Sequence, residues 1–107
     1  MNLLTIEIET ILPTISSVEQ QPFKDLVAVV KFFHPVLKVQ WFVFGGDHVD
    51  DDYMFYGIIF HKDRPKGKIC YFTLSEFEDW LLPFAGSIFG VKHDKLFKPT
   101  PASKLSC

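Results

Sequence analysis

Residues 68–82, KICYFTLSEFEDWLL, contain the end of one structural element and the start of another. The residues up to Thr73 are mostly β-branched or aromatic, which predicts a strand. Thr73 and Glu76 then have the spacing of a capping box, in which a hydroxyl and a carboxylate bind free N–H groups at a helix start. We therefore predict a helix over residues 73–82 that covers one face of a sheet. Its predicted buried face consists of Leu74, Phe77 and Leu81, with Trp80 at the edge.

Three further strands are predicted before this stretch. Residues 26–33 are mainly apolar on both alternating sides, as in the interior of a sheet, and His34-Pro35 ends the run. Residues 39–44 and 53–61 are also rich in β-branched and aromatic side chains, which predicts a strand in each.

Glycine and proline mark the predicted connections between these strands. Gly45-Gly46 opens a loop through Asp52, and Gly57 indicates a bulge or a close backbone approach. Pro65 and Gly67 fit the second and fourth positions of a type I turn. Because the connections are short, we predict an antiparallel meander of about four strands, which together with the helices makes an α+β fold.

The two ends of the chain carry weaker signals. Residues 3–12 fit both an amphipathic helix and an alternating strand, and we predict a short helix that ends before Pro13. Residues 13–22 lack a sustained period, which predicts an exposed connection. After the apolar Phe97, residues 98–107 contain two prolines and are expected to fray.

The composition predicts one domain over residues 1–107, because 48% hydrophobic and 16% aromatic residues are enough for a core. The net charge of -2 argues against a generally basic nucleic-acid binder. Cys70 and Cys107 have no ligand spacing, so we expect no disulfide framework. Without a secretory signal or a membrane-spanning run, we expect a cytoplasmic protein with no membrane association. The oligomeric state stays open.

Candidate partner-binding residues lie in an acidic loop that consists of Asp47, His48, Asp50, Asp51 and Asp52. Such a loop could ligate a cation, but an EF-hand that began at Asp47 would need glycine at position 52 and glutamate at position 58. A solvated hairpin tip is therefore favoured over a calcium site. We predict no metal and no cofactor.

The opposite charge gathers in the next connection, at Lys62, Arg64, Lys66 and Lys68. With Tyr71 and Phe72 close by, these residues are candidates for binding a nucleic-acid phosphate backbone. The simpler interpretation is a charged hairpin that blocks edge pairing. In a meander the acidic and basic loops lie at opposite ends of the sheet, which predicts a dipolar molecule.

The sequence contains no recognised catalytic motif, and we predict no catalytic residues. The histidines stand on separate predicted elements, at His34, His48, His61 and His93. Cys70 lies in a strand, where a cysteine is usually an unreactive small hydrophobe. The aromatic residues in 41–60 exceed what one sheet face needs, so they form either further core or an exposed protein-binding patch.

Two local motifs, Tyr71-Phe72-Thr73-Leu74-Ser75-Glu76 and Phe97-Lys98-Pro99, make the chain resemble a known family. It is a family of small domains of unknown function, encoded mostly on bacterial plasmids, integrative elements and phages. Agreement at Leu12-Pro13 and Trp41-Phe42 extends the resemblance over nearly the whole chain. The acidic loop and residues 82–91 depart from the family pattern.

The resemblance implies no enzyme activity, because the family has no established catalytic residues. It implies a mobile genetic element as the setting, where small acidic proteins often disarm host defence. We therefore predict a non-enzymatic counter-defence inhibitor, of the anti-CRISPR or anti-restriction type, that binds a host defence protein through the acidic loop. The alternatives are a nucleic-acid accessory module that uses residues 62–68 and a small enzyme whose site is not visible in the sequence.

Overall fold

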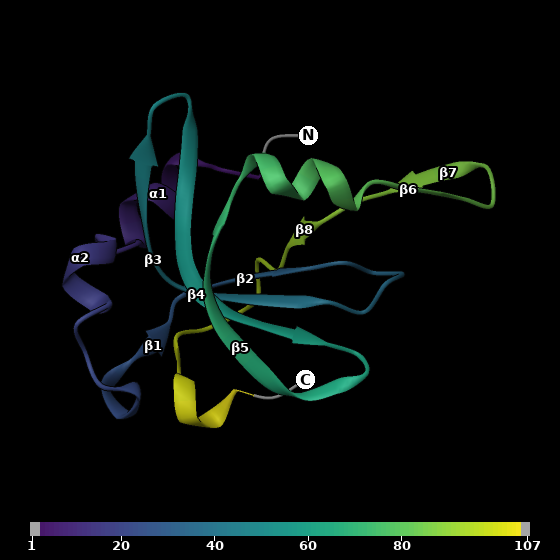
Figure 1. Ribbon diagram of the computed structural model, residues 1–107. Helices are drawn as coiled ribbons and strands as arrows, with labels where there is room; N and C mark the ends of the chain where they lie inside the picture. Colours follow the sequence, from purple (N-terminus) through teal and green to yellow (C-terminus); the bar gives the residue numbers. More distant parts are fainter. Residues whose placement is uncertain (1–2, 106–107) are drawn as a thin grey trace.

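A five-stranded antiparallel sheet forms the centre of the molecule (Figure 1). The structure is a computed structural model that describes residues 3–105, except for the side chains of residues 64 and 65. The strands, in the spatial order β5-β4-β3-β2-β8, are β5 (Arg64–Thr73), β4 (Asp52–His61), β3 (Gln40–Val49), β2 (Val30–Phe33) and β8 (Lys92–His93). The predicted α+β class and the antiparallel meander are confirmed, and β8 adds a fifth strand beside β2.

Strand β3 continues through Gly45 and Gly46, where the sequence predicts a loop. That prediction is wrong because both glycines are buried and pair with β4. Their lack of a side chain makes room for neighbours, since a Cβ on Gly46 would lie 2.5 Å from Cε1 of Tyr53. The chain reverses later, at Asp50-Asp51.

Gly57 lies at a close backbone approach between two central strands, as predicted. A Cβ on Gly57 would be 2.1 Å from the carbonyl oxygen of Phe42 on β3. The register between β3 and β4 also shifts between Val43 and Gly45, beside this contact. Only glycine allows the two backbones to come this close.

The β4–β5 turn consists of Lys62 and Asp63, because His61 pairs with Arg64. The turn predicted around Pro65 and Gly67 is therefore misplaced. Gly67 serves packing instead, since a Cβ there would lie 2.7 Å from the Ile58 side chain.

The predicted N-terminal helix is present as α1 (Ile6–Ile11). Its first turn is capped by Thr5, whose Oγ1 accepts a hydrogen bond from the Ile8 N–H at 3.2 Å. Ile8 is buried against the sheet, and the helix ends before Pro13. The helical alternative for residues 3–12 is therefore correct.

Two segments predicted to be irregular are ordered. Residues 13–22 contain α2 (Ile15–Val18), and Val18 packs into the core. Near the C-terminus, β9 (Thr100–Pro101) pairs with β1 (Val27–Ala28), and the 3-10 helix η3 (Ala102–Lys104) buries Ala102. The expected fraying is thus wrong for residues 98–105, while residues 106 and 107 lie outside the described part.

The predicted strand over 26–33 is split into β1 and β2. A further 3-10 turn, η1 (Phe23–Asp25), precedes β1.

The predicted capping box is present at the end of β5. The Glu76 N–H donates to Thr73 Oγ1 at 3.3 Å, and the Thr73 N–H donates to the Glu76 carboxylate at 3.1 Å. The element that follows is the 3-10 helix η2 (Ser75–Trp80), not the α-helix predicted over 73–82.

The 3-10 geometry changes which side chains of η2 face the core. With about three residues per turn, side chains three positions apart line up. Leu74, Phe77 and Trp80 therefore pack against the sheet. Leu81, a predicted core residue, is instead 52% exposed.

After η2 the chain forms a hairpin of β6 (Leu82–Phe84) and β7 (Ser87–Phe89), which projects from the body of the molecule (Figure 1). Its turn residues Ala85 and Gly86 have φ angles of 53° and 81°. The sequence predicts only a connection in this region.

No helix in residues 3–105 is long and apolar enough to span a membrane.

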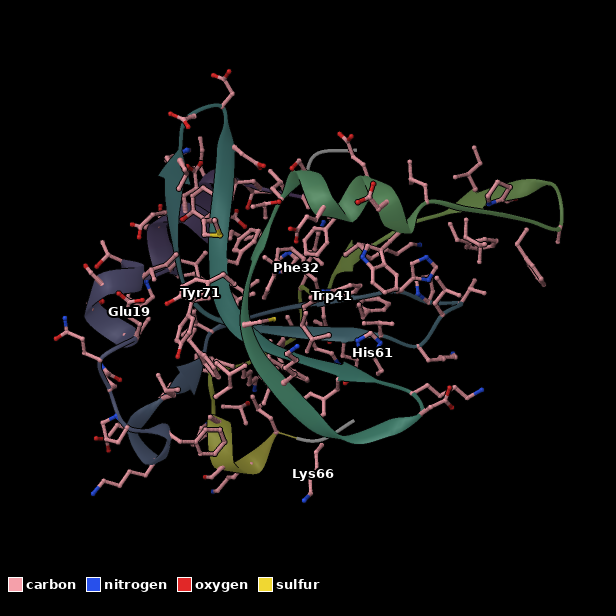
Figure 2. All side chains as sticks on the ribbon, in the orientation of Figure 1. Glu19, Phe32, Trp41, His61, Lys66 and Tyr71 are labelled. Carbon is pink, nitrogen blue, oxygen red and sulfur yellow. The ribbon has the colours of Figure 1, made fainter. Side chains whose placement is uncertain are left out.

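Both faces of the sheet are buried, which explains most of the aromatic excess. One core contains Phe32, Trp41, Phe55 and Phe77, and Figure 2 shows Phe32 and Trp41 between the sheet and η2. The other core contains Phe42, Phe44 and Phe60. Of the two alternatives for these aromatic residues, core is therefore correct.

Candidate functional site

The β3–β4 turn carries the acidic residues predicted as a binding site. Asp50 and Asp51 connect the paired residues Val49 and Asp52, and both turn residues are exposed. Asp50 has a φ angle of 54°, in the left-handed region that aspartate adopts more readily than most residues. The tip of the hairpin therefore presents two carboxylates to solvent.

The other three predicted residues, Asp47, His48 and Asp52, bind other parts of the chain. Asp47 Oδ2 accepts a hydrogen bond from the Ile15 N–H at 2.9 Å, at the start of α2. The His48 ring contacts the Glu9 carboxylate on α1. These contacts hold α1 and α2 against β3 and give the side chains a structural role.

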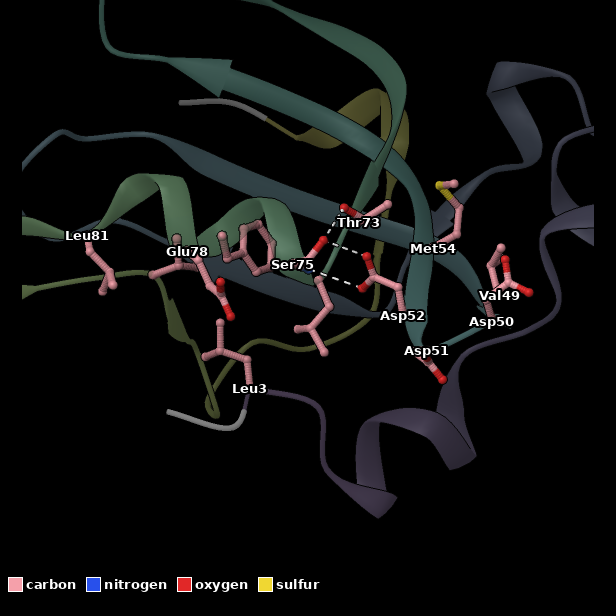
Figure 3. A pocket seen from close by; sticks show the side chains of 13 residues that line it. Leu3, Val49, Asp50, Asp51, Asp52, Met54, Thr73, Ser75, Glu78 and Leu81 are labelled. Atoms are coloured by element: carbon pink, nitrogen blue, oxygen red, sulfur yellow. Dashed lines mark hydrogen bonds between the residues drawn. The ribbon is translucent and has the colours of Figure 1, made fainter.

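Asp52 joins the start of β4 to the start of η2 (Figure 3). Its Oδ2 accepts a hydrogen bond from the Ser75 hydroxyl at 2.5 Å. Its Oδ1 accepts from the Tyr53 N–H at 2.8 Å and from the Ser75 N–H at 3.2 Å. The Ser75 hydroxyl first, and then the Tyr53 N–H, lower the pKa of Asp52 below its ordinary value of 3.8. The ionised carboxylate therefore clamps these two elements together.

Asp52→Asn is expected to lower the free energy of unfolding at neutral pH. The free energy of unfolding of this variant should also change less with pH in the acidic range. Because the pKa is lower in the folded chain, ionised Asp52 stabilises the fold above about pH 4, and this contribution disappears as the pH falls through the folded-state pKa. Urea unfolding of both proteins across this range should give values that converge in acid. Equal stability at neutral pH would contradict the clamp.

A groove with a volume of about 800 Å³ lies beside this clamp, between the β3–β4 turn and η2 (Figure 3). Its most deeply buried lining residues are Phe77 and Val91. Further apolar surface comes from Leu3, Val49, Met54, Leu74 and Leu81. Asp50, Asp51 and Glu78 also line the groove. It thus combines apolar walls with three carboxylates that the clamp does not use.

The 3-10 geometry of η2 explains why Glu78 belongs to the groove. Ser75 and Glu78 are three residues apart in η2, and such side chains align along a 3-10 helix. Both line the groove, as does Leu81 directly after the helix. The sequence alone misses Glu78 because an α-helix, with about 3.6 residues per turn, does not keep these residues in one row.

Leu81 links the groove to the projecting β6–β7 hairpin. Leu81 is 52% exposed, and Phe84 and Ile88 on the hairpin are 57% and 70% exposed. The Phe84 ring lies 6.3 Å from the Phe89 ring, measured between centroids. Several large apolar side chains on one exposed element are typical of a protein-binding surface.

The predicted basic residues lie at the other end of the sheet from Asp50. Lys62 is in the β4–β5 turn, and the exposed Lys66 and Lys68 lie on β5, with Lys66 pointing away from the body in Figure 2. Arg64 begins β5, but its side chain is outside the described part. Because β4 runs from the acidic turn to the basic turn, the predicted separation of charge is confirmed.

The histidines and Cys70 lie on different elements. His34 and His61 both approach the Trp80 ring, at centroid distances of 6.5 Å and 6.3 Å, whereas His93 lies on β8. Burial lowers the pKa of His93 and raises the pKa of the Cys70 thiol, which disfavours the reactive thiolate. Within residues 3–105, no three His, Cys, Asp or Glu side chains are grouped to hold a metal ion. Cys107 lies outside the described residues.

Comparison with known proteins gives one family. The model of a family described as a protein of unknown function (DUF2958) matches residues 3–106. No curated protein and no solved structure matches the chain significantly. The comparisons therefore agree with a small domain of unknown function, as the sequence motifs predict.

Proposed function

We propose that the chain, which belongs to the DUF2958 family of unknown function, is a non-enzymatic protein-binding module. The observation that carries the proposal is the groove that joins apolar walls to Asp50, Asp51 and Glu78. Apolar side chains of a partner bury the walls and supply most of the binding energy. The carboxylates select the charge of the partner.

The groove fits a segment of a partner protein in which Lys or Arg stands beside apolar residues. Cationic side chains pair with the three groove carboxylates, whereas an acidic segment meets like charge and is rejected. The exposed Phe84 and Ile88 lie on the hairpin that follows Leu81 and offer further apolar surface to a longer partner segment. Charge and apolar surface together therefore favour a cationic amphipathic segment.

The proposed partner is a host defence protein, and the proposed role is counter-defence of the anti-CRISPR or anti-restriction type in the host cytoplasm. The support for this setting is the resemblance to proteins encoded on mobile elements. Defence nucleases bind nucleic acid through Lys and Arg, and carboxylates pair with those same side chains. Occupying them would block access to the phosphate backbone.

Selection of peptides from a random phage-displayed library tests the groove without a known partner. Peptides that bind the full chain are expected to carry Lys or Arg next to apolar residues. The variant Asp50→Asn/Asp51→Asn/Glu78→Gln should weaken their binding roughly tenfold, since three exposed ion pairs together contribute about 1.4 kcal/mol. Asparagine at position 50 tolerates the left-handed backbone, so the turn is preserved.

The matched control is Glu7→Gln/Asp25→Asn/Asp79→Asn, which changes net charge equally outside the groove lining. It should bind the peptides like the unmodified chain. An equal loss in both variants, or selected peptides without cationic residues, would overturn the groove proposal.

Affinity capture from host extract, followed by mass spectrometry, tests the counter-defence role separately. The unmodified chain and the control are expected to retain a defence protein that the groove variant loses. If the chain captures only proteins unrelated to defence, and the groove variant loses them, the counter-defence role is rejected. The proposal of a protein-binding module is then still supported.

A further inference from the structure

We propose that a second cavity, at the basic end of the sheet, binds the phosphate backbone of single-stranded nucleic acid. This cavity has a volume of about 590 Å³ and is lined by Lys31, Lys38 and Lys62. The turn between β2 and β3 and the β4–β5 turn lie at the same end of the sheet (Figure 1). The fold thus brings together lysines from three separate segments.

The charges around the cavity leave it positive. Lys31 Nζ lies 3.7 Å from Asp94 Oδ2, so one of the three cations has a nearby counter-charge. Lys38 and Lys62 are exposed, and their ammonium groups are available to an anion. Lys38 stands in the turn between β2 and β3, with a φ angle of 58°. Two net positive charges therefore face the cavity.

The remaining cavity walls suit a nucleotide better than an isolated ion. Phe33, Pro35 and Val39 supply apolar surface, and Gln40 supplies an amide. Lysine ammonium groups bind phosphate as point charges, and an aromatic ring such as the half-buried Phe33 supports an unstacked base. The cavity can hold one phosphate with its base.

Two further lysines favour an extended polyanion over a single phosphate. Lys66 and Lys68 are exposed on β5, directly after the turn that contains Lys62. A single-stranded nucleic acid with one phosphate in the cavity continues past these side chains. Because lysines contact phosphates and leave base edges unread, binding is expected to be independent of sequence.

Fluorescence anisotropy of a labelled oligothymidylate, titrated with the full chain over a range of salt, tests this site. Binding should weaken with salt, and each neutralised phosphate contributes about 0.7 to the logarithmic slope for single strands. Lys38→Asn/Lys62→Gln should therefore reduce the slope by about 1.4. Asp94→Asn should strengthen binding, because it removes the counter-charge of Lys31 and retains an oxygen acceptor for the Leu96 N–H.

The matched control, Lys24→Gln/Lys104→Gln, removes equal charge outside the cavity lining and should keep the slope of the unmodified chain. Inorganic phosphate is expected to compete with the oligonucleotide. The Asp50→Asn/Asp51→Asn/Glu78→Gln variant should bind the oligonucleotide at least as well as the unmodified chain. The proposal for this cavity and the proposal for the groove can therefore be rejected separately.

Three results would overturn the proposal. A flat titration at low salt would remove the site. Equal slope changes in the cavity variant and its control would show that binding depends on overall charge and not on the cavity. Equally tight binding of polyglutamate, lost with the same cavity variant, would assign the cavity to acidic polypeptides.

Discussion

Gly57→Ala is expected to lower the free energy of unfolding by about 3 kcal/mol, at the upper end of the cost of overpacking a core. The added Cβ would lie 2.1 Å from the carbonyl oxygen and 3.0 Å from the carbonyl carbon of Phe42. Both atoms belong to the backbone of β3, which cannot rotate away like a side chain. Relief requires separation of the two central strands, measurable by urea unfolding.

Gly86→Ala provides the contrast for this prediction. A Cβ on Gly86 meets nothing within 4 Å, and only its left-handed φ angle of 81° adds strain. We expect a loss of about 1 kcal/mol, restricted to the projecting hairpin. If Gly57→Ala were no more destabilising than Gly86→Ala, the close approach of β3 and β4 would be wrong.

His34→Ala is expected to be about as damaging, with a loss of roughly 3 kcal/mol. The His34 side chain is 1% exposed, and its Nδ1 accepts the N–H groups of Val36 and Leu37 at 3.2 Å and 3.0 Å. Nε2 therefore carries the proton and donates to the Trp80 carbonyl oxygen at 2.8 Å. Alanine would remove all three hydrogen bonds, and at about 1 kcal/mol for each the expected loss is roughly 3 kcal/mol.

His48→Ala is the matched control for His34, because the His48 side chain is 68% exposed. It should cost less than about 1 kcal/mol, since exposed ion pairs contribute little. Thermal unfolding of the two variants gives the comparison. Similar melting temperatures would show that the His34 hydrogen bonds do not secure the turn and the end of η2.

Local chemistry explains which parts of the fold the sequence predicts correctly. The Thr73–Glu76 capping box depends on residues close in sequence, and both of its hydrogen bonds are present. The strands follow from residue type and alternation. The same capping box marks a helix start without distinguishing an α-helix from the 3-10 helix that η2 forms, so the sequence predicts the wrong helix type.

The misplaced turns have a similar cause. Gly45, Gly46 and Gly67 have the composition of loop residues, but each lies in a strand where a Cβ would collide with a neighbour. In such positions glycine indicates close packing in place of a turn. Only the three-dimensional neighbours distinguish the two roles.

The sequence predicts which acidic residues lie at the candidate site. It does not predict which of their carboxylates are bound within the fold and which face the groove. The partners of Asp47 and Asp52 lie 32 and 23 residues away, at Ile15 and Ser75. No local pattern shows that these two carboxylates are held within the fold. The same long-range folding adds Glu78 to the groove.

The most direct test of the central claim is the amide NMR spectrum of the labelled chain during titration with a selected cationic peptide. The groove account predicts saturable shifts around Asp50, Asp51, Glu78 and Val91, and the Asp50→Asn/Asp51→Asn/Glu78→Gln variant should need roughly tenfold more peptide to reach them. Shifts confined to the Lys38 and Lys62 end, or unchanged by the triple substitution, would contradict it.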